Sequence, residues 1–259
     1  MKYSGNFFCN KDGVISIEFA ACFCLFSALL FIIYDVYATI MLQNRLERTT
    51  YTVASVFRER SSLYPAKNAI IKNNKLELCN SSADCFKTYE LFDDTQVEEL
   101  RQLATKLLGG RDVSIQIEAF FMLQRPNDIY RTSDVIFSSK SCPSGVCNNK
   151  FNDFFNSLPL LFGRQGGPTA FAYFTRYAKR RVPEKYKNGY SYSISGRYVP
   201  FYRISMCIVN EESLYLKWIN SSRDASDTLP NLCSDTVVLS RCNDVLDPDE
   251  TSCPLYVLE

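Results

Sequence analysis

The stretch VISIEFAACFCLFSALLFII, residues 14–33, determines how the rest of this 259-residue chain is organised. It contains 20 residues and a single charged side chain, Glu18. An α-helix of this length spans about 30 Å, which matches the hydrocarbon core of a bilayer. A cleaved secretory signal normally has a shorter apolar region of about 7–15 residues that ends in small residues, and residues 34–37 (YDVY) do not supply them. We therefore expect a retained membrane helix.

The helical pattern continues beyond this apolar run. Leu42, Leu46, Val53 and Phe57 recur with helical spacing on one face, while charged residues lie largely off it. After residue 14, the first helix-breaking residue is Pro65. We predict one continuous helix over residues 14–60, apolar in its first half and amphipathic in its second half. Such a helix is far longer than a membrane span requires.

Glu18 is the single charge in the apolar run, and it has two interpretations. A charged residue inside a membrane helix is costly, at about 2.5–3.5 kcal/mol on insertion scales and less near the interface. In the first interpretation, Glu18 lies at the membrane interface and reaches water. In the second, the chain is cut after Gly13, so that Val14 carries a free α-amine and Glu18 of one subunit neutralises the amine of a neighbouring subunit.

The residues Gly13-Val14-Ile-Ser-Ile-Glu18-Phe19 resemble the G/xxxxEF processing site of type IV prepilin-like proteins. Together with the long helix and the large C-terminal region, they most resemble the minor pseudopilins of the tight-adherence (Tad) secretion system, the TadE and TadF group, and TadF in particular. This resemblance implies cleavage after Gly13 by a prepilin peptidase and a role for Glu18 in processing or subunit docking. The implied organisation is a leader (1–13), a transmembrane pilin-like helix (14–60) and a periplasmic domain (61–259).

The same resemblance implies a function. The chain would take part in assembly of, or secretion by, a Flp-type pilus that serves surface attachment and biofilm formation. Its partners would be other pilin and pseudopilin subunits, inner-membrane pilus assembly proteins, the prepilin peptidase and the membrane itself. It would either stay in the inner membrane or enter a cell-surface pilus. The alternative is a membrane-anchored or pilus-tip adhesin that recognises a surface or glycan, for which the basic, tyrosine-containing residues 176–187 are candidates.

Cysteine usage indicates the compartment of the C-terminal region. Of the 11 cysteines, Cys9 lies in the leader and Cys22 and Cys24 lie in the apolar run. The remaining eight suit disulfides in an oxidising compartment, which places the domain in the periplasm or outside the cell and the N-terminus in the cytoplasm. A metal site is the competing interpretation, but the sequence has no C-x-x-C and no histidine. Eight cysteines allow 105 pairings. Two pairs, Cys79–Cys85 and Cys142–Cys147, are favoured because each closes a short polar loop. The other four cysteines of this set are Cys207, Cys233, Cys242 and Cys253.

The region after residue 60 predicts an α+β domain with an antiparallel sheet. Residues 95–108 have the spacing of an amphipathic helix that ends at Gly109-Gly110. Residues 113–121 begin with the strict alternation of a half-buried strand. Further strand candidates lie at 191–199, 202–209, 214–219 and 236–239.

Composition argues against catalysis and against nucleic-acid binding. The chain has no histidine, which excludes Ser-His-Asp and Cys-His nucleophiles, and its formal net charge of +1 lacks the basic excess of a nucleic-acid binder. It contains no phosphate-binding loop and no hydrolase motif. We therefore expect no enzyme activity and no cofactor. One acidic loop offers oxygen ligands for calcium, although a solvated acidic loop explains the same residues: Asp244, Asp247, Asp249 and Glu250.

Overall fold

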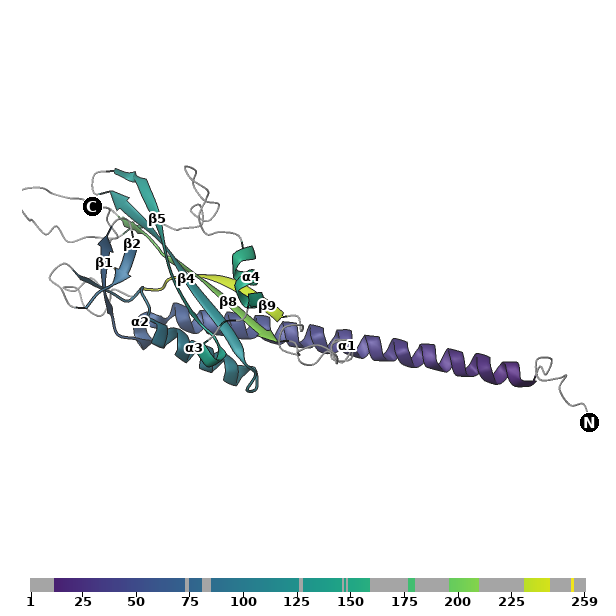
Figure 1. Cartoon of the computed structure of the whole chain (residues 1–259). Helices are drawn as coiled ribbons and strands as arrows, with labels where there is room; N and C mark the ends of the chain where they lie inside the picture. The colour runs from purple at the N-terminus through teal and green to yellow at the C-terminus, as the bar shows by residue number, and fades with distance from the viewer. Residues whose placement is uncertain are drawn as a thin grey trace, which may run out of the picture. The chain divides into compact units, whose positions relative to one another are not determined.

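The chain begins with one long α-helix, α1, which runs from Asp12 to Arg58 (Figure 1). A one-turn helix, α2 (Arg60–Leu63), follows it and ends before Pro65. Proline removes a backbone N–H and clashes with the preceding turn, so the helical path stops here. The predicted long N-terminal helix is confirmed.

The computed structural model describes residues 12–72, 75–80, 85–125, 128–145, 147, 149–158, 177–179, 196–209, 231–242 and 253. The chain divides into two compact units. Residues 1–44 and 210–230 form one unit, and residues 45–209 and 231–259 form the other. The division falls inside α1, so the last turns of this helix belong to the unit that holds the sheets.

The main sheet of the second unit has four antiparallel strands in the order β5-β4-β8-β9 (Figure 1). Their bounds are β4 Val113–Arg125, β5 Asp128–Ser141, β8 Phe201–Val209 and β9 Asn231–Leu239. A smaller antiparallel sheet, β2-β1-β3, contains β1 Lys67–Lys72, β2 Lys75–Leu78 and β3 Phe86–Thr88. A third pairs β6 Tyr177–Lys179 with β7 Gly196–Tyr198. The predicted α+β class with an antiparallel sheet is confirmed.

Helix α3 (Asp94–Leu107) packs against β4 and β5. It begins where the Asp93 side chain accepts a hydrogen bond from the Gln96 N–H, at 3.0 Å. It ends in a Schellman motif, because Gly110 N–H donates to Thr105 O at 2.8 Å and Gly109 N–H to Lys106 O at 3.1 Å. Gly109 has a φ of 76°, which glycine adopts without strain. The predicted helix at 95–108 and its glycine end are therefore confirmed.

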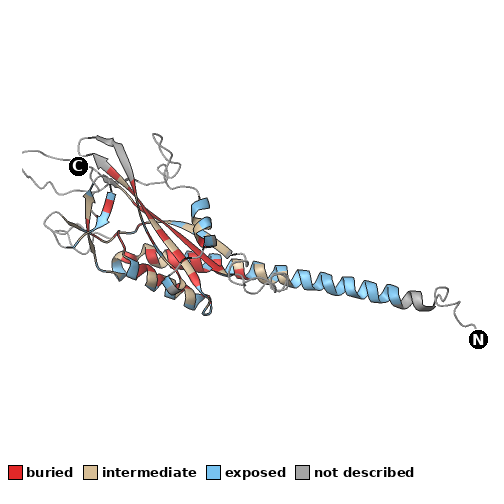
Figure 2. Ribbon diagram, in the orientation of Figure 1, coloured by how far each residue is buried: buried red, intermediate tan, exposed pale blue. Residues whose placement is uncertain are grey.

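Strand β8 is the centre of the main sheet, although it lies far along the chain from β4. Eight of its nine residues are buried, so both faces of this strand are covered (Figure 2). On β4, by contrast, one face is fully buried and carries Val113, Ile115, Ile117, Ala119, Phe121 and Leu123. The predicted strands at 113–121, 202–209 and 236–239 lie within β4, β8 and β9. Of the candidate at 191–199, residues 196–198 form β7, while 214–219 lies outside the described residues.

Four cysteine pairs lie at disulfide distance: Cys79–Cys85, Cys142–Cys147, Cys207–Cys233 and Cys242–Cys253. The first two are the short-range pairs that the polar loops favour. The third joins residues that face each other in the β8–β9 register. Next to it, the 3₁₀ turn at Pro143–Gly145 leads to helix α4 (Asn149–Ser157), whose Phe151 packs with Cys142 and Cys207.

Candidate functional site

The first part of α1 carries an exposed apolar surface (Figure 2). By length and composition the helix can cross a membrane, and its most apolar 18-residue window has no buried residue. Soluble monomeric proteins rarely expose a continuous apolar surface of this extent, and its length suits a bilayer. The large exposed side chains include Ile17, Phe19, Phe23, Leu25, Phe26, Leu29, Leu30, Phe31, Ile32, Ile33, Val36, Ile40 and Met41.

Polar side chains within this surface form hydrogen bonds to their own helix. The Ser27 hydroxyl donates to Phe23 O at 2.8 Å, and the Thr39 hydroxyl donates to Asp35 O at 3.0 Å. Such i to i−4 bonds satisfy the hydroxyl without water, which an apolar solvent requires. Neither residue therefore interrupts the apolar character of the helix.

The predicted processing site lies at the beginning of α1. Gly13 and Val14 are in its first turn, and the side chains of Glu18 and Phe19 are exposed. The first four N–H groups of a helix have no intrahelical partner, and glycine lowers helix stability by about 1 kcal/mol relative to alanine. The bond after Gly13 therefore lies in the first turn of the helix, where the N–H groups have no intrahelical partner.

The last turns of α1 belong to the domain, and one face of them is buried. Leu46, Val53 and Phe57 are fully buried, and the Phe57 ring packs edge-on against Tyr202 of β8 at 4.8 Å between centroids. The buried Thr50 hydroxyl donates to Leu46 O at 2.9 Å. Arg45 donates to Leu107 O at 3.3 Å, where the C-terminal end of α3 favours a cation.

A buried polar cluster fixes the junction between α1 and the sheet. Arg60, at 2% exposure, donates to Glu90 O at 3.2 Å, to Leu91 O, and to Gln96 Oε1 at 2.6 Å. Its guanidinium also lies over the Phe57 ring at 4.7 Å from the centroid. These contacts supply hydrogen bonds to both terminal nitrogens and a ring face to the desolvated guanidinium. The sequence offers no motif for this cluster.

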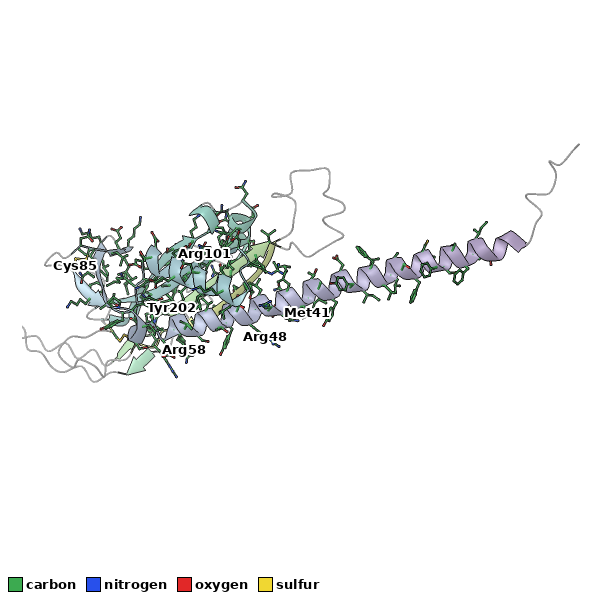
Figure 3. All side chains as sticks on the ribbon, turned by 90° about the horizontal axis from the view of Figure 1, so that it is seen from below. Met41, Arg48, Arg58, Cys85, Arg101 and Tyr202 are labelled. Carbon is green, nitrogen blue, oxygen red and sulfur yellow. A yellow bond between two sulfur atoms is a disulfide. The ribbon has the colours of Figure 1, made fainter. Side chains whose placement is uncertain are left out.

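Two more residues belong to the same cluster: Tyr202 of β8, and Ser240, the residue directly after β9. The Tyr202 hydroxyl donates to Glu90 O at 3.0 Å, and the Ser240 hydroxyl donates to Glu90 Oε1 at 2.9 Å. Complete burial raises the pKa of Tyr202 to about 12, so its hydroxyl stays protonated and able to donate. Figure 3 labels Tyr202 among the packed side chains of this unit. The cluster joins residues from distant segments of the chain.

Other predicted residues are distributed as follows. Cys22 and Cys24 of α1 are free and exposed, in agreement with their place in the apolar run. Asp244, Asp247, Asp249 and Glu250 lie outside the described residues, as does most of the basic stretch 176–187. Within the described part of the chain, no group of three or more metal-ligating side chains is arranged around one point.

The fold and this surface define the class of the protein. An apolar, membrane-length helix continues without a break into an antiparallel α+β domain, which is the architecture of a helix-anchored subunit of pilin type. More specifically, the chain belongs to the TadF family. The family described as "Putative tight adherence pilin protein F" matches residues 6–147, more than half of the 259-residue chain. The resemblance to Tad pseudopilins is thereby confirmed.

Comparison with curated proteins and with solved structures gave no significant match. The family match ends at residue 147, within the Cys142–Cys147 loop. Strands β8 and β9 lie beyond it but complete the sheet that β4 and β5 begin. These two strands are therefore part of the same sheet as the matched region.

Proposed function

We propose that the chain is a minor pseudopilin that takes part in assembly of, or secretion by, a Flp-type pilus for surface attachment and biofilm formation. The TadF family match carries this proposal. The form of α1 supports it, because one helix has an exposed apolar part suited to a bilayer and a final part that is built into a folded domain.

The proposed location is the inner membrane, with a single pass, the N-terminus in the cytoplasm and the domain in the periplasm. The support comes from the four cysteine pairs, because disulfides form and persist in oxidising compartments. The domain therefore belongs on the oxidising side of the membrane, and residues 1–13 on the other. From here the subunit either remains in the membrane or enters the filament.

Processing is the second part of the proposal. A prepilin peptidase cuts the bond after Gly13, in the first turn of α1. The new α-amine of Val14 then becomes the cation that Glu18 of a neighbouring subunit neutralises, which offsets the cost of a carboxylate near the apolar core. Residue Glu18 thus acts in processing or docking, and the chain performs no catalysis of its own. Inner-membrane partner proteins supply the energy for assembly.

The test combines mapping of the mature N-terminus with a matched pair of substitutions. Mass spectrometry of the chain isolated from membranes is expected to show a start at Val14, and a start at Met1 contradicts the processing proposal. We expect Glu18→Gln to impair pilus assembly, because it removes the charge and keeps the shape. Glu47→Gln, at an exposed position of the same helix, is the control.

Deletion of the whole protein tests the assembly role. Loss of both pili and attachment supports it. Normal pili with attachment lost contradicts it and favours the adhesin alternative. Truncation at residue 61 is a poor substitute, since it uncovers Phe57, which the domain buries completely.

A further inference from the structure

The disulfides of the domain share one property, because each joins two cysteines that follow one another in the sequence. The pairs are Cys79–Cys85, Cys142–Cys147, Cys207–Cys233 and Cys242–Cys253. Among these eight cysteines, no pair encloses or crosses another. Of the 105 pairings that eight cysteines allow, a single one has this property. The pairing therefore follows the order of the chain.

Local structure positions the first two pairs. The Cys79–Cys85 pair links the end of β2 to the beginning of β3, and the Cys79 N–H donates to Asn68 O of β1 at 3.0 Å. The Cys142–Cys147 pair closes around the 3₁₀ turn, in which Gly145 N–H donates to Cys142 O at 3.0 Å. Each of these segments is complete before the next cysteine of the domain is synthesised. Both pairs can therefore close without the rest of the domain.

The third pair depends on strand register. Cys207 faces Cys233 across β8 and β9, with a Cα–Cα distance of 4.1 Å. Cys242 follows Cys233 by nine positions, so at about 5–20 residues per second it is synthesised about 0.5–2 s later. A β-hairpin forms in about 1–10 μs, which leaves a margin of about four to six orders of magnitude for the longer β8–β9 connection. The native partner is therefore in place before a competing cysteine arrives.

The other three cysteines do not compete for these partners. In the proposed location Cys9 remains on the cytoplasmic side, while Cys22 and Cys24 lie in the apolar part of α1. With α1 held in the membrane, the chain crosses from α1 towards its C-terminus, and the domain cysteines emerge in numerical order. When the second cysteine of each pair emerges, the one unpaired thiol already outside is its native partner.

We propose that the four disulfides close one at a time, from Cys79–Cys85 to Cys242–Cys253, as the chain crosses the membrane. The partner is a thiol–disulfide oxidoreductase that acts as the oxidant, and no disulfide isomerase is required. The proposal rests on the proposed function, because that function sets the direction in which the chain crosses. Isomerisation needs a thiolate that attacks a wrong disulfide, and ordered closure produces no wrong disulfide.

Each closure is a thiol–disulfide exchange in two steps. The thiolate of the first cysteine attacks the disulfide of the oxidant and forms a mixed disulfide. The thiolate of the second cysteine attacks this mixed disulfide, which closes the protein disulfide and releases the oxidant as a dithiol. One S–S bond is broken and one is formed, and two electrons and two protons pass from the chain to the oxidant.

Mapping of the disulfides in three kinds of cell tests the proposal: parental cells, cells without the periplasmic disulfide isomerase and cells without the periplasmic thiol oxidant. Free thiols of the full-length protein are blocked with N-ethylmaleimide at lysis, and mass spectrometry of unreduced peptides identifies the pairs. We expect the four native pairs at parental yield without the isomerase, and a several-fold loss without the oxidant. A several-fold rise in non-consecutive pairs without the isomerase overturns the proposal. Parental yields without the oxidant overturn the choice of partner.

A matched pair of variants tests the order of closure in the isomerase-free cells. Cys79→Ala leaves Cys85 without its native partner, so we expect Cys85 to pair with Cys142, the next cysteine to emerge. Cys79→Ala with Cys85→Ala lacks the same native disulfide and is expected to keep the other three native pairs.

Two outcomes for the single variant overturn the order. Cys85 left as a free thiol beside three native pairs shows that folding alone selects partners. Equal pairing of Cys85 with all later cysteines shows that closure follows release of the whole chain. If all eight cysteines of the unchanged protein are blocked as free thiols in parental cells, the proposed location fails, and with it the proposed function. Disulfides with the wrong partners contradict the order of closure alone.

Discussion

The two parts of α1 share one helical backbone, but their surroundings differ. In residues 17–41 the large side chains are exposed on all sides, whereas in residues 45–58 a single face is buried by the domain (Figure 2). Figure 3 labels one residue from each part, Met41 and Arg48, both of which are exposed. Helical periodicity alone therefore does not determine what a helix packs against. The first part needs lipid or another helix, while the second part has its partner within the chain.

The largest expected effect is on the free energy of unfolding, and it differs between one phenylalanine in each part of α1. Phe57→Ala removes a fully buried ring that contacts Phe92 and Tyr202, so we expect it to lower the free energy of unfolding of the domain by about 3–5 kcal/mol. Phe26→Ala, in the exposed part, is expected to leave it within about 0.5 kcal/mol. Urea unfolding of the full-length protein in detergent, followed by proteolysis, measures both. Equal effects contradict the comparison.

Cysteine substitutions test the difference between the exposed part of α1 and the domain. Replacing the cross-strand pair, Cys207→Ala with Cys233→Ala, is expected to destabilise the domain by about 2–4 kcal/mol, because the link between β8 and β9 restrains the unfolded chain. The matched double variant Cys22→Ala with Cys24→Ala removes two free thiols from the exposed part and is expected to have no effect on the domain. A loss of stability in the second variant contradicts the account.

A smaller effect is expected at the junction cluster. Tyr202→Phe keeps the ring against Phe57 but deletes the hydroxyl that donates to Glu90 O. We expect a loss of about 0.5–1.5 kcal/mol, the net value of one hydrogen bond, in the same unfolding assay. An unchanged stability shows that this hydroxyl does not help to fix the end of α1 to the sheet.

The smallest effect depends on pH. Hydrogen bonds from Arg101 and then from Ser141 lower the pKa of Glu98 from 4.5 to about 2. A lowered pKa stabilises the fold above pH 4.5, and this contribution is lost as the pH falls towards 2. Because Glu98 is partly exposed, solvent screens the interaction and the change is small. Glu98→Gln is expected to reduce the change in the free energy of unfolding between these pH values. Glu77→Gln, at an exposed site on β2, is the control and is expected to leave this pH dependence as it is.

Local patterns in the sequence predict the local elements of this fold. The long helix, α3 with its glycine end, and β4 each follow from spacing within about a dozen residues. The short pairs Cys79–Cys85 and Cys142–Cys147 follow from loop length for the same reason.

Contacts between distant segments could not be predicted in this way. The position of β8 next to β4 depends on side chains about 80 to 95 residues away, and the Cys207–Cys233 pair follows only from the β8–β9 register. Arg60 is a second example, because a charged residue after an amphipathic helix normally indicates solvent. Its burial depends on carbonyl groups of Glu90 and Leu91 that no sequence pattern brings to it.

The central claim is that the first part of α1 lies within a membrane. The native thiols Cys22 and Cys24 test it directly, since both are free and exposed on this part of the helix. Intact membranes are treated with a water-soluble, membrane-impermeant maleimide, and mass spectrometry locates the label. We predict no label on either thiol in membranes and full labelling after denaturation in sodium dodecyl sulfate. Labelling of Cys22 and Cys24 in intact membranes contradicts the account.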